Sequence, residues 1–340
     1  GDHRDLHLSL RRQRQMCIRD RTDADYETFK QLGVNHINGF PEISHQNWTS
    51  SNLKEYKEKV ESYGLNLDMV QLPLSSRDLD ERAKSGEFYN ILTGKSPERD
   101  IEIDRICEII QMCSEAKIPA LKYNLNIIGI PRTKSELGRG GAKLSTFNWE
   151  NADKNSPDTI AGKVSEDIFW ERIEYFLDKV VPVAEENKIR LACHPHDPYT
   201  PPGFKGVTRV LGTVEGLKKF ISIKENDFHG LNFCQGTITE MMENPGEEIF
   251  DVIRYFGERK KIFNVHFRNI RGSKLNFTEV FPDEGSINMY EAIKVYKEVN
   301  YPYMLMPDHV PQINAKDPKM TAFAYCYGYI NALLQTVNEI

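Results

Sequence analysis

The chain has few cysteines and no long apolar run. Its 340 residues include six cysteines, too few for a scaffold built on disulfides, so each cysteine has to be explained individually. No segment approaches the roughly 20 consecutive apolar residues of a membrane span, and the first residues lack the apolar stretch of a secretory signal. We therefore expect a cytoplasmic protein without a membrane partner.

Positive charge is also in deficit. The chain has 44 Lys and Arg against 50 Asp and Glu, a formal net charge of −6, which disfavours binding to polyanions, so we expect no nucleic-acid partner. With 39% hydrophobic and 28% charged residues, the composition excludes disordered and fibrous proteins and allows a large buried core.

The first 21 residues differ from the rest. They contain six Arg, three Asp and no Lys, so removing them changes the net charge from −6 to −9. The Arg-rich run has no apolar partner face and no turn residues. We predict that residues 1–21 form a disordered or non-native segment, with a basic binding arm as the alternative, and that residues 22–340 form the catalytic domain.

From Thr22 onward, helical patterns alternate with short apolar segments, which is typical of βα units around a parallel sheet. The helical patterns cover residues 23–33, 49–63, 98–116, 167–187, 213–224, 245–258, 288–299 and 319–338. The predicted strands cover residues 34–40, 67–72, 119–128, 189–194, 231–234, 262–269 and 303–309. We expect Ser50 or Ser51 to cap the second helix.

Seven strands and eight helices predict a single α/β domain, a (β/α)₈ TIM barrel that lacks only its first strand. That strand would lie just before residue 23. An open doubly wound sheet is the structural alternative.

Four residues of metal-ligand type follow the late strands at equivalent positions: His194, Cys234, His266 and Asp308. In a barrel the C-terminal ends of the strands converge at one mouth, so residues distant in sequence can meet there. Two imidazoles, a thiolate and a carboxylate complete the ligand shell of a divalent metal. Each residue alone could be a buried core residue or a cap. Their recurrence in four consecutive units favours the metal site.

Neighbouring polar residues suit a small anionic substrate. His309 follows Asp308 and is the best candidate for an acid or base near neutral pH. Arg268 lies two residues after His266, so it shares that face of the strand and could clamp a carboxylate or form a structural ion pair. Tyr123 and Asn124 end the third predicted strand.

Two arginines lie in the loops beyond these strands. Arg132 follows Asn124 in its loop, and Arg209 lies in the Pro-rich loop after His194. Like Tyr123 and Asn124, they could bind substrate hydroxyls or anchor their loops. The GRGGAK segment at 138–143 lacks the ending and setting of a phosphate-binding loop.

Several segments in order resemble a known family. ACHPHDP, PGFKGVTRVLGTVEGLKKF, GLNFCQGT, VHFRNI and MPDH, preceded by YNLNII and RT, resemble mannonate dehydratase over roughly residues 23–335. This family belongs to the xylose-isomerase-like TIM barrels. The chain departs from the family's pattern around the substrate, where His196 replaces the first of two acids and Val310 replaces a glycine.

The resemblance implies a hydro-lyase that converts D-mannonate to 2-keto-3-deoxy-D-gluconate with Mn²⁺ as cofactor. It matches the metal ligands to the four strand-end residues, the acid/base to His309 and a catalytic tyrosine to Tyr325. The ligand types would also suit Zn²⁺ or Fe²⁺, so Mn²⁺ depends on the resemblance.

Other functions remain open at this point. A metal-dependent sugar isomerase or epimerase on the same barrel needs two proton-transfer groups but no departing hydroxyl. A non-catalytic barrel that binds metal or sugar acid is a third hypothesis, and a DNA-repair nuclease is disfavoured by the charge. We expect a small sugar acid as the partner molecule and allow for a homodimer.

Overall fold

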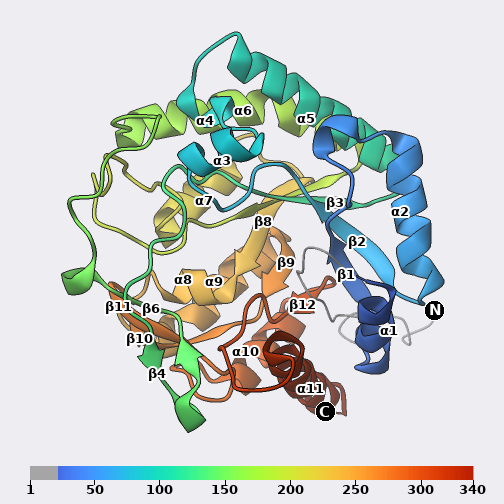
Figure 1. Ribbon diagram of the computed structural model, residues 1–340, viewed down its shortest axis with the longest axis vertical. Helices are drawn as coiled ribbons and strands as arrows, with labels where there is room; N and C mark the ends of the chain where they lie inside the picture. The colour runs from blue at the N-terminus through green and yellow to red at the C-terminus, as the bar shows by residue number, and fades with distance from the viewer. Residues whose placement is uncertain (1–21, 340) are drawn as a thin grey trace.

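The computed structural model describes residues 22–339 (Figure 1). The Arg-rich segment 1–21 and the predicted first strand lie outside these residues. Both therefore stay predictions.

Seven parallel strands form the central sheet, in the order β1-β2-β3-β7-β8-β9-β12 (Figure 1). The strands are β1 (His36–Gly39), β2 (Asn66–Gln71), β3 (Ala120–Asn124), β7 (Arg190–His194), β8 (His229–Cys234), β9 (Ile262–His266) and β12 (Leu305–Met306). All seven correspond to predicted strands. Within the described residues β1 and β12 are the two edges of the sheet, which curls as a barrel lacking one strand would.

Helices surround the sheet. The long ones are α1 (Asp23–Gln31), α2 (Ser50–Ser62), α5 (Glu98–Glu115), α6 (Glu166–Asn187), α7 (Val214–Ser222), α9 (Pro245–Glu258), α10 (Met289–Glu298) and α11 (Pro318–Glu339). Neighbouring helices pack side by side. Both α2 and α6 contact α5, and both α9 and α11 contact α10. In the described part of the chain, no helix combines the length and apolarity needed to cross a membrane.

Side-chain caps explain where several helices begin. Thr49, rather than the predicted Ser50 or Ser51, caps α2, and its hydroxyl accepts from the Asn52 N–H while the Asn52 side chain accepts from the Thr49 N–H. Ser165 and Thr213 cap α6 and α7 in the same position. Each cap satisfies an N–H group that has no partner within the helix.

The loops at the C-terminal ends of the strands contain structure that the sequence patterns did not predict. The extra strands are β4 (Glu136–Leu137), β5 (Lys143–Leu144), β6 (Thr146–Asn148), β10 (Asn269–Ser273) and β11 (Asn276–Val280). The extra helical turns are η2 (His45–Asn47), α3 (Leu79–Ser85), α4 (Asn90–Thr93), η3 (Arg139–Gly141), η4 (Trp149–Asn151) and α8 (Gln235–Thr239). β10, β11 and β6 form an antiparallel sheet, which joins the long loop after β3 to the loop after β9.

The register of the main sheet places the strand ends level with one another. Cys234 on β8 pairs with His266 on β9, which also pairs with Met306 on β12. The pairing of Cys234 with His266 follows a register shift between β8 and β9 after Leu231. On the other side, Asn124 on β3 pairs with His194 on β7. Chemically useful side chains from five strands therefore reach the same end of the sheet.

His229, at the start of β8, predicts part of the acid sensitivity of the fold. Burial lowers the pKa of this histidine to about 4, although its ring nitrogen Nε2 contacts the Phe220 carbonyl at 2.9 Å. The unfolded chain binds this proton near pH 6.5, so the contribution is complete above pH 6.5 and is lost as the pH falls toward 4. We expect a loss of roughly 3 kcal/mol in unfolding free energy across this window from His229 alone.

Urea unfolding of His229→Gln and of the unmutated protein at several pH values measures this effect. The variant should show a shallower fall between pH 6.5 and 4, whatever its stability at pH 7. Parallel curves for the two proteins would contradict the assignment.

Candidate metal centre

The four residues predicted as metal ligands come together at the mouth of the barrel. One ligand atom from each of His194, Cys234, His266 and Asp308 lies within 4.8 Å of the others. They come from the ends of β7, β8 and β9 and from the residues after β12. The barrel geometry thus makes one cluster from positions spread over 115 residues of sequence.

The two histidines are held by neighbouring groups. His194 Nδ1 lies 2.7 Å from the Pro195 carbonyl oxygen, and donation of its proton there leaves Nε2 as the coordinating nitrogen. Burial, reinforced by the charge of Lys122, lowers the pKa of His194 to about 4, so the ring is neutral at pH 7. His266 Nδ1 lies 3.1 Å from an Asp308 oxygen.

Cys234 is fully buried, yet its surroundings favour the thiolate. Its sulfur accepts from the Thr237 hydroxyl at 3.1 Å and from the Thr237 N–H at 3.5 Å, and Arg268 Nη2 donates to it at 3.6 Å. Burial raises the pKa of the thiol, but Arg268 and His266 outweigh burial, and the pKa is lowered overall. A thiolate is the form of cysteine that binds metal.

Asp308 has a left-handed backbone conformation, with φ +68°. This region is strained for most residues, although Asp tolerates it better than branched residues do. The conformation turns the carboxylate toward His266, and Oδ2 also lies 3.8 Å from the Cys234 sulfur. Despite burial, His266 and His309 hold the pKa of Asp308 well below its usual value.

This donor set fits a divalent cation. Two imidazoles, a thiolate and a carboxylate supply four donor atoms and two negative charges, which match the charge of the ion. The Nδ1 atom of His266 is buried, and its neighbour is another member of the cluster, an Asp308 oxygen at 3.1 Å, so the donor atoms face one another as ligands of a single ion would. Metal binding itself remains a prediction.

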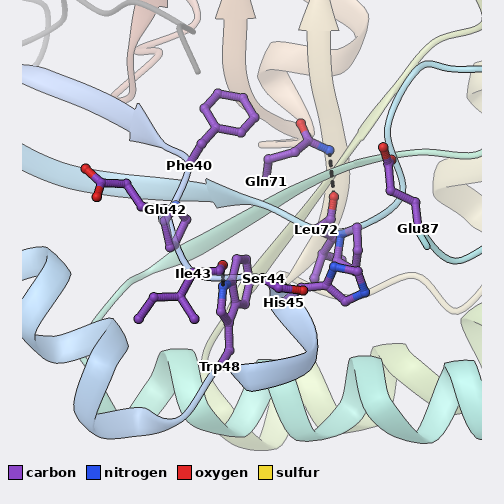
Figure 2. Close-up of a pocket in the computed structure, with 11 residues that line it drawn as sticks. Phe40, Glu42, Ile43, Ser44, His45, Trp48, Gln71, Leu72 and Glu87 are labelled. Atoms are coloured by element: carbon purple, nitrogen blue, oxygen red, sulfur yellow. Dashed lines mark hydrogen bonds between the residues drawn. The ribbon is translucent and has the colours of Figure 1, made fainter. Parts of the chain in front are cut away.

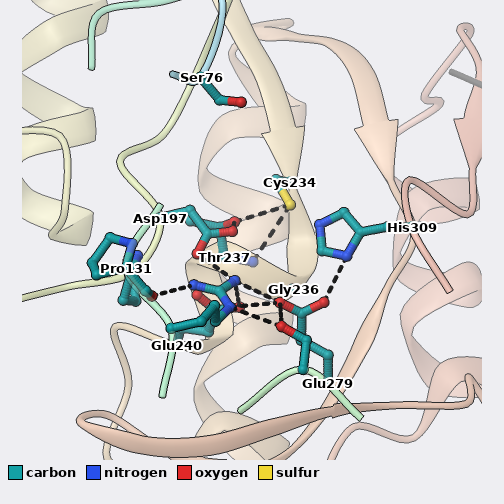
Figure 3. A network of polar contacts seen from close by, with 12 residues as sticks. Ser76, Pro131, Asp197, Cys234, Gly236, Thr237, Glu240, Glu279 and His309 are labelled. Carbon is teal, nitrogen blue, oxygen red and sulfur yellow. Dashed lines mark hydrogen bonds and ion pairs between the residues drawn. The ribbon is translucent and has the colours of Figure 1, made fainter. Parts of the chain in front are cut away.

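His309 contacts two carboxylates beside the cluster, and Figure 3 shows the contact with Glu279. Its Nδ1 lies 2.6 Å from Glu279 Oε2 on β11, and its Nε2 lies 3.2 Å from Asp308 Oδ2. Loss of water around the ring lowers its pKa, but Asp308 and Glu279 raise the pKa to about 9. Glu279 therefore orients the ring so that Nε2 faces the ligand cluster.

Arg268 and Arg132 were predicted to bind substrate, but both are engaged in buried ion pairs. Arg268 lies 2.8 Å from Glu279 and 3.2 Å from both Asp197 and Glu240. Arg132 lies 2.6 Å from Asp197 and also pairs with Glu279. These ion pairs favour the structural alternative for Arg268, because carboxylates of the protein already lie against both guanidiniums.

Charge balances within this network (Figure 3). Burial and the nearby Asp197 raise the pKa of Glu240 well above its usual value, against the opposing charges of Arg268 and Arg132. The same arginines lower the pKa of Asp197 and of Glu279, whose carboxylates lie opposite the two guanidiniums. Asp197, Glu279 and His309 also form a cluster of metal-ligand type, but these arginines already supply its counter-charge.

Two further candidates for substrate binding, Tyr123 and Arg209, have other contacts in the structure. Tyr123 alternates with Asn124 on β3, so it faces the outer helices, where its ring lies 5.7 Å from that of Phe176. Arg209 is buried and donates to the carbonyl oxygens of Asp197, Pro198 and Gly129, each at 2.7 to 2.8 Å. It anchors loops, whereas Asn124 lines the cavity beside the metal centre.

Tyr325 also lies away from the metal centre. Its side chain, on α11, is not among those that line the cavity there. The residue is 41% exposed, its ring packs edge-on against Phe281, and its hydroxyl interacts with Asp283 and Arg139. The structure therefore does not bring Tyr325 together with His309 and the ligand cluster.

We expect Tyr325→Phe to keep kcat and KM within about twofold of the unmutated protein, since only surface contacts of the hydroxyl are lost. Steady-state kinetics with the best substrate would check this. A fall of 100-fold or more in kcat, as expected for loss of an acid or base, would restore Tyr325 to the active site.

The cavity beside the metal centre has a volume of about 250 Å³, which fits a small molecule. Its lining includes five of the residues discussed above, Asn124, His194, Asp197, Asp308 and His309, and several that the sequence patterns did not indicate. These are Phe40, Gln71, Ser75, Ser76, Arg77, Lys122 and Ile130. A second cavity of about 310 Å³ adjoins it and shares Phe40 and Gln71 (Figure 2).

One signal in the sequence could have identified Lys122. It lies two residues before Asn124 on the same strand and therefore on the same face. For Glu279 no such signal existed, because β11 was not predicted as a strand.

Comparisons with known proteins agree with this geometry. The family model described as D-mannonate dehydratase (UxuA) matches residues 159–339, more than half of the 340 residues. A mannonate dehydratase from Endomicrobium trichonymphae is 37% identical over 150 residues, which cover 43% of this chain and 39% of that protein. One from Thermotoga maritima is 26% identical over 77% of this chain and 78% of its own length.

Solved structures show the same barrel. The mannonate dehydratase of Streptococcus suis serotype 2 superposes with a TM-score of 0.79 at 24% identity, covering 96% of this chain and 93% of that one. A D-tagatose 3-epimerase-like protein gives a TM-score of 0.60 at 16% identity, covering 96% and 98%. The predicted α/β TIM-barrel fold is thereby confirmed, and the chain belongs to the mannonate dehydratase family of hydro-lyases.

Proposed function

We propose that this protein is a metal-dependent sugar-acid dehydratase that converts D-mannonate to 2-keto-3-deoxy-D-gluconate and water, with Mn²⁺ as the resident ion. The observation that carries the proposal is the cluster of His194, Cys234, His266 and Asp308 beside a cavity that His309 also lines. The family assignment supports the same reaction.

Dehydration of a 2,3-dihydroxy acid requires removal of the C2 proton and protonation of the departing C3 hydroxyl. His309 is the histidine of the cavity outside the four-residue cluster, and it is placed to exchange one of these protons through Nε2. Glu279 holds its Nδ1 and so keeps the ring in one orientation. When bound, a divalent ion supplies Lewis-acid stabilisation of the negative charge that develops on the substrate.

The test is conversion of a panel of aldonates by the purified protein with Mn²⁺. A 2-keto-3-deoxy product from D-mannonate is the expected result, with protein stripped of metal by a chelator as the inactive control. Formation of a ketose or an epimer instead would identify an isomerase or epimerase. Tight binding of aldonates without any conversion would identify a binding protein.

A further inference from the structure

Lys122 is a largely buried residue that lines the substrate cavity and has no counter-ion among the described residues. The residue is 8% exposed and lines the cavity beside the metal centre. Among the described residues, no carboxylate forms an ion pair with its Nζ and no acceptor forms a hydrogen bond with it. The ammonium is therefore free to pair with an anion that enters the cavity.

The strands around Lys122 aim it into the cavity. It pairs with Gln71 on β2 and with Ala192 on β7, so these three side chains lie side by side on one face of the sheet. Gln71 also lines the cavity, and the small side chain of Ala192 leaves room for the long lysine stem. The charge of Lys122 reaches His194, whose pKa it helps to lower.

The other cationic groups that line this cavity already have partners: His309 contacts Glu279 and Asp308, and Arg77 contacts Glu87. The Arg77 guanidinium lies 3.0 Å from Glu87, and its side chain is 41% exposed. Arg132 and Arg268 are likewise neutralised by carboxylates. Within the described part of the cavity, Lys122 is thus the cation whose charge remains unmatched.

We infer that Lys122 binds the carboxylate of the substrate and selects anionic sugar acids over neutral sugars of the same size. The inference rests on the proposed sugar-acid chemistry of this cavity. The ligand cluster balances the charge of a divalent ion by itself, so one substrate carboxylate and one ammonium complete the charge balance of the site.

The experiment compares an acid with its neutral counterpart. Calorimetry measures the binding of D-mannonate and D-mannitol to Mn²⁺-loaded protein carrying His309→Gln, which prevents turnover. In this background Lys122→Met should weaken D-mannonate binding by about 10- to 100-fold and leave D-mannitol binding and metal content unchanged. Lys122→Arg should keep D-mannonate binding within about tenfold.

Lys261→Met is the matched control. Lys261 is also buried, at 4% exposure. It lies just before β9, at the opposite end of the sheet, and its Nζ donates to the Asn226 carbonyl. The control should bind D-mannonate like the parent. If Lys122→Met does not fold, Lys122→Gln serves as the second neutral variant.

Two results would overturn the inference. One is equal weakening of acid and neutral ligand. The other is a Lys122→Met variant of the otherwise unmutated enzyme with unchanged KM and a collapsed kcat, which would make Lys122 a proton-transfer group. Lys122-dependent binding in a protein that dehydrates no aldonate would leave the inference standing and reject the dehydratase. Absence of any aldonate binding would reject both.

Discussion

Replacing Cys234 with alanine is expected to empty the metal centre and to reduce activity below about 1% of that of the unmutated protein. Mutation of residues that only hydrogen-bond to a metal ligand already weakens metal binding or activity by about 10- to 100-fold, so loss of a ligand itself should have at least this effect. The thiolate supplies one of the two negative charges of the cluster, and its sulfur lies 3.8 Å from Asp308. Alanine leaves three ligands and a single negative charge for a divalent ion.

Metal content per chain, measured after gel filtration without chelator, tests this prediction. Cys193→Ala is the matched control because Cys193 lies on the adjacent strand β7, is equally buried and faces the outer helices beside Tyr123. It should lose some stability and keep its metal. Stoichiometric metal in Cys234→Ala would disprove the ligand set.

The second large effect is expected from His309→Gln. Turnover should fall by about 10²- to 10⁴-fold, the usual contribution of a general acid or base, while metal content stays unchanged. Gln keeps a side-chain donor near Glu279 but cannot exchange a proton at neutral pH. Retained turnover would exclude His309 as the acid or base.

His36→Gln is a suitable control. His36, at the start of β1, pairs with Asp68 at 2.7 Å at the opposite end of the sheet, so its loss should leave kcat unchanged. The positioning role of Glu279 can be tested in the same series. If Glu279 acts through His309, Glu279→Gln should lower kcat in the unmutated protein but add little in the His309→Gln background.

The sequence patterns predicted the repeating part of the fold well. All seven strands of the sheet and its eight long helices appear near their predicted positions. These elements depend on local periodicity and on caps such as Thr213, and both can be recognised within a short window of sequence. The hairpin of β10 and β11 was missed because RGSKLNFTEV follows the apolar β9 segment without a clear break and alternates only weakly.

The sequence indicated the clustered ligand residues better than the roles of the nearby arginines. The four ligands were found because strand ends in a barrel share one mouth. Arg268, Arg132 and Arg209 were assigned to substrate because an arginine near a cavity suggests an anion. Each of them instead has its partners supplied by Asp197, by Glu279 or by backbone carbonyls from other loops.

The sequence alone determined the family, the barrel and the four residues that meet at its mouth, because these depend on local patterns repeated in every βα unit. Only the tertiary structure decided which charges remain available for a substrate. That depends on pairing between segments far apart in the chain. Glu279 from β11 neutralises arginines from two other loops and positions His309, whereas no carboxylate in the described part of the chain forms an ion pair with Lys122 on β3.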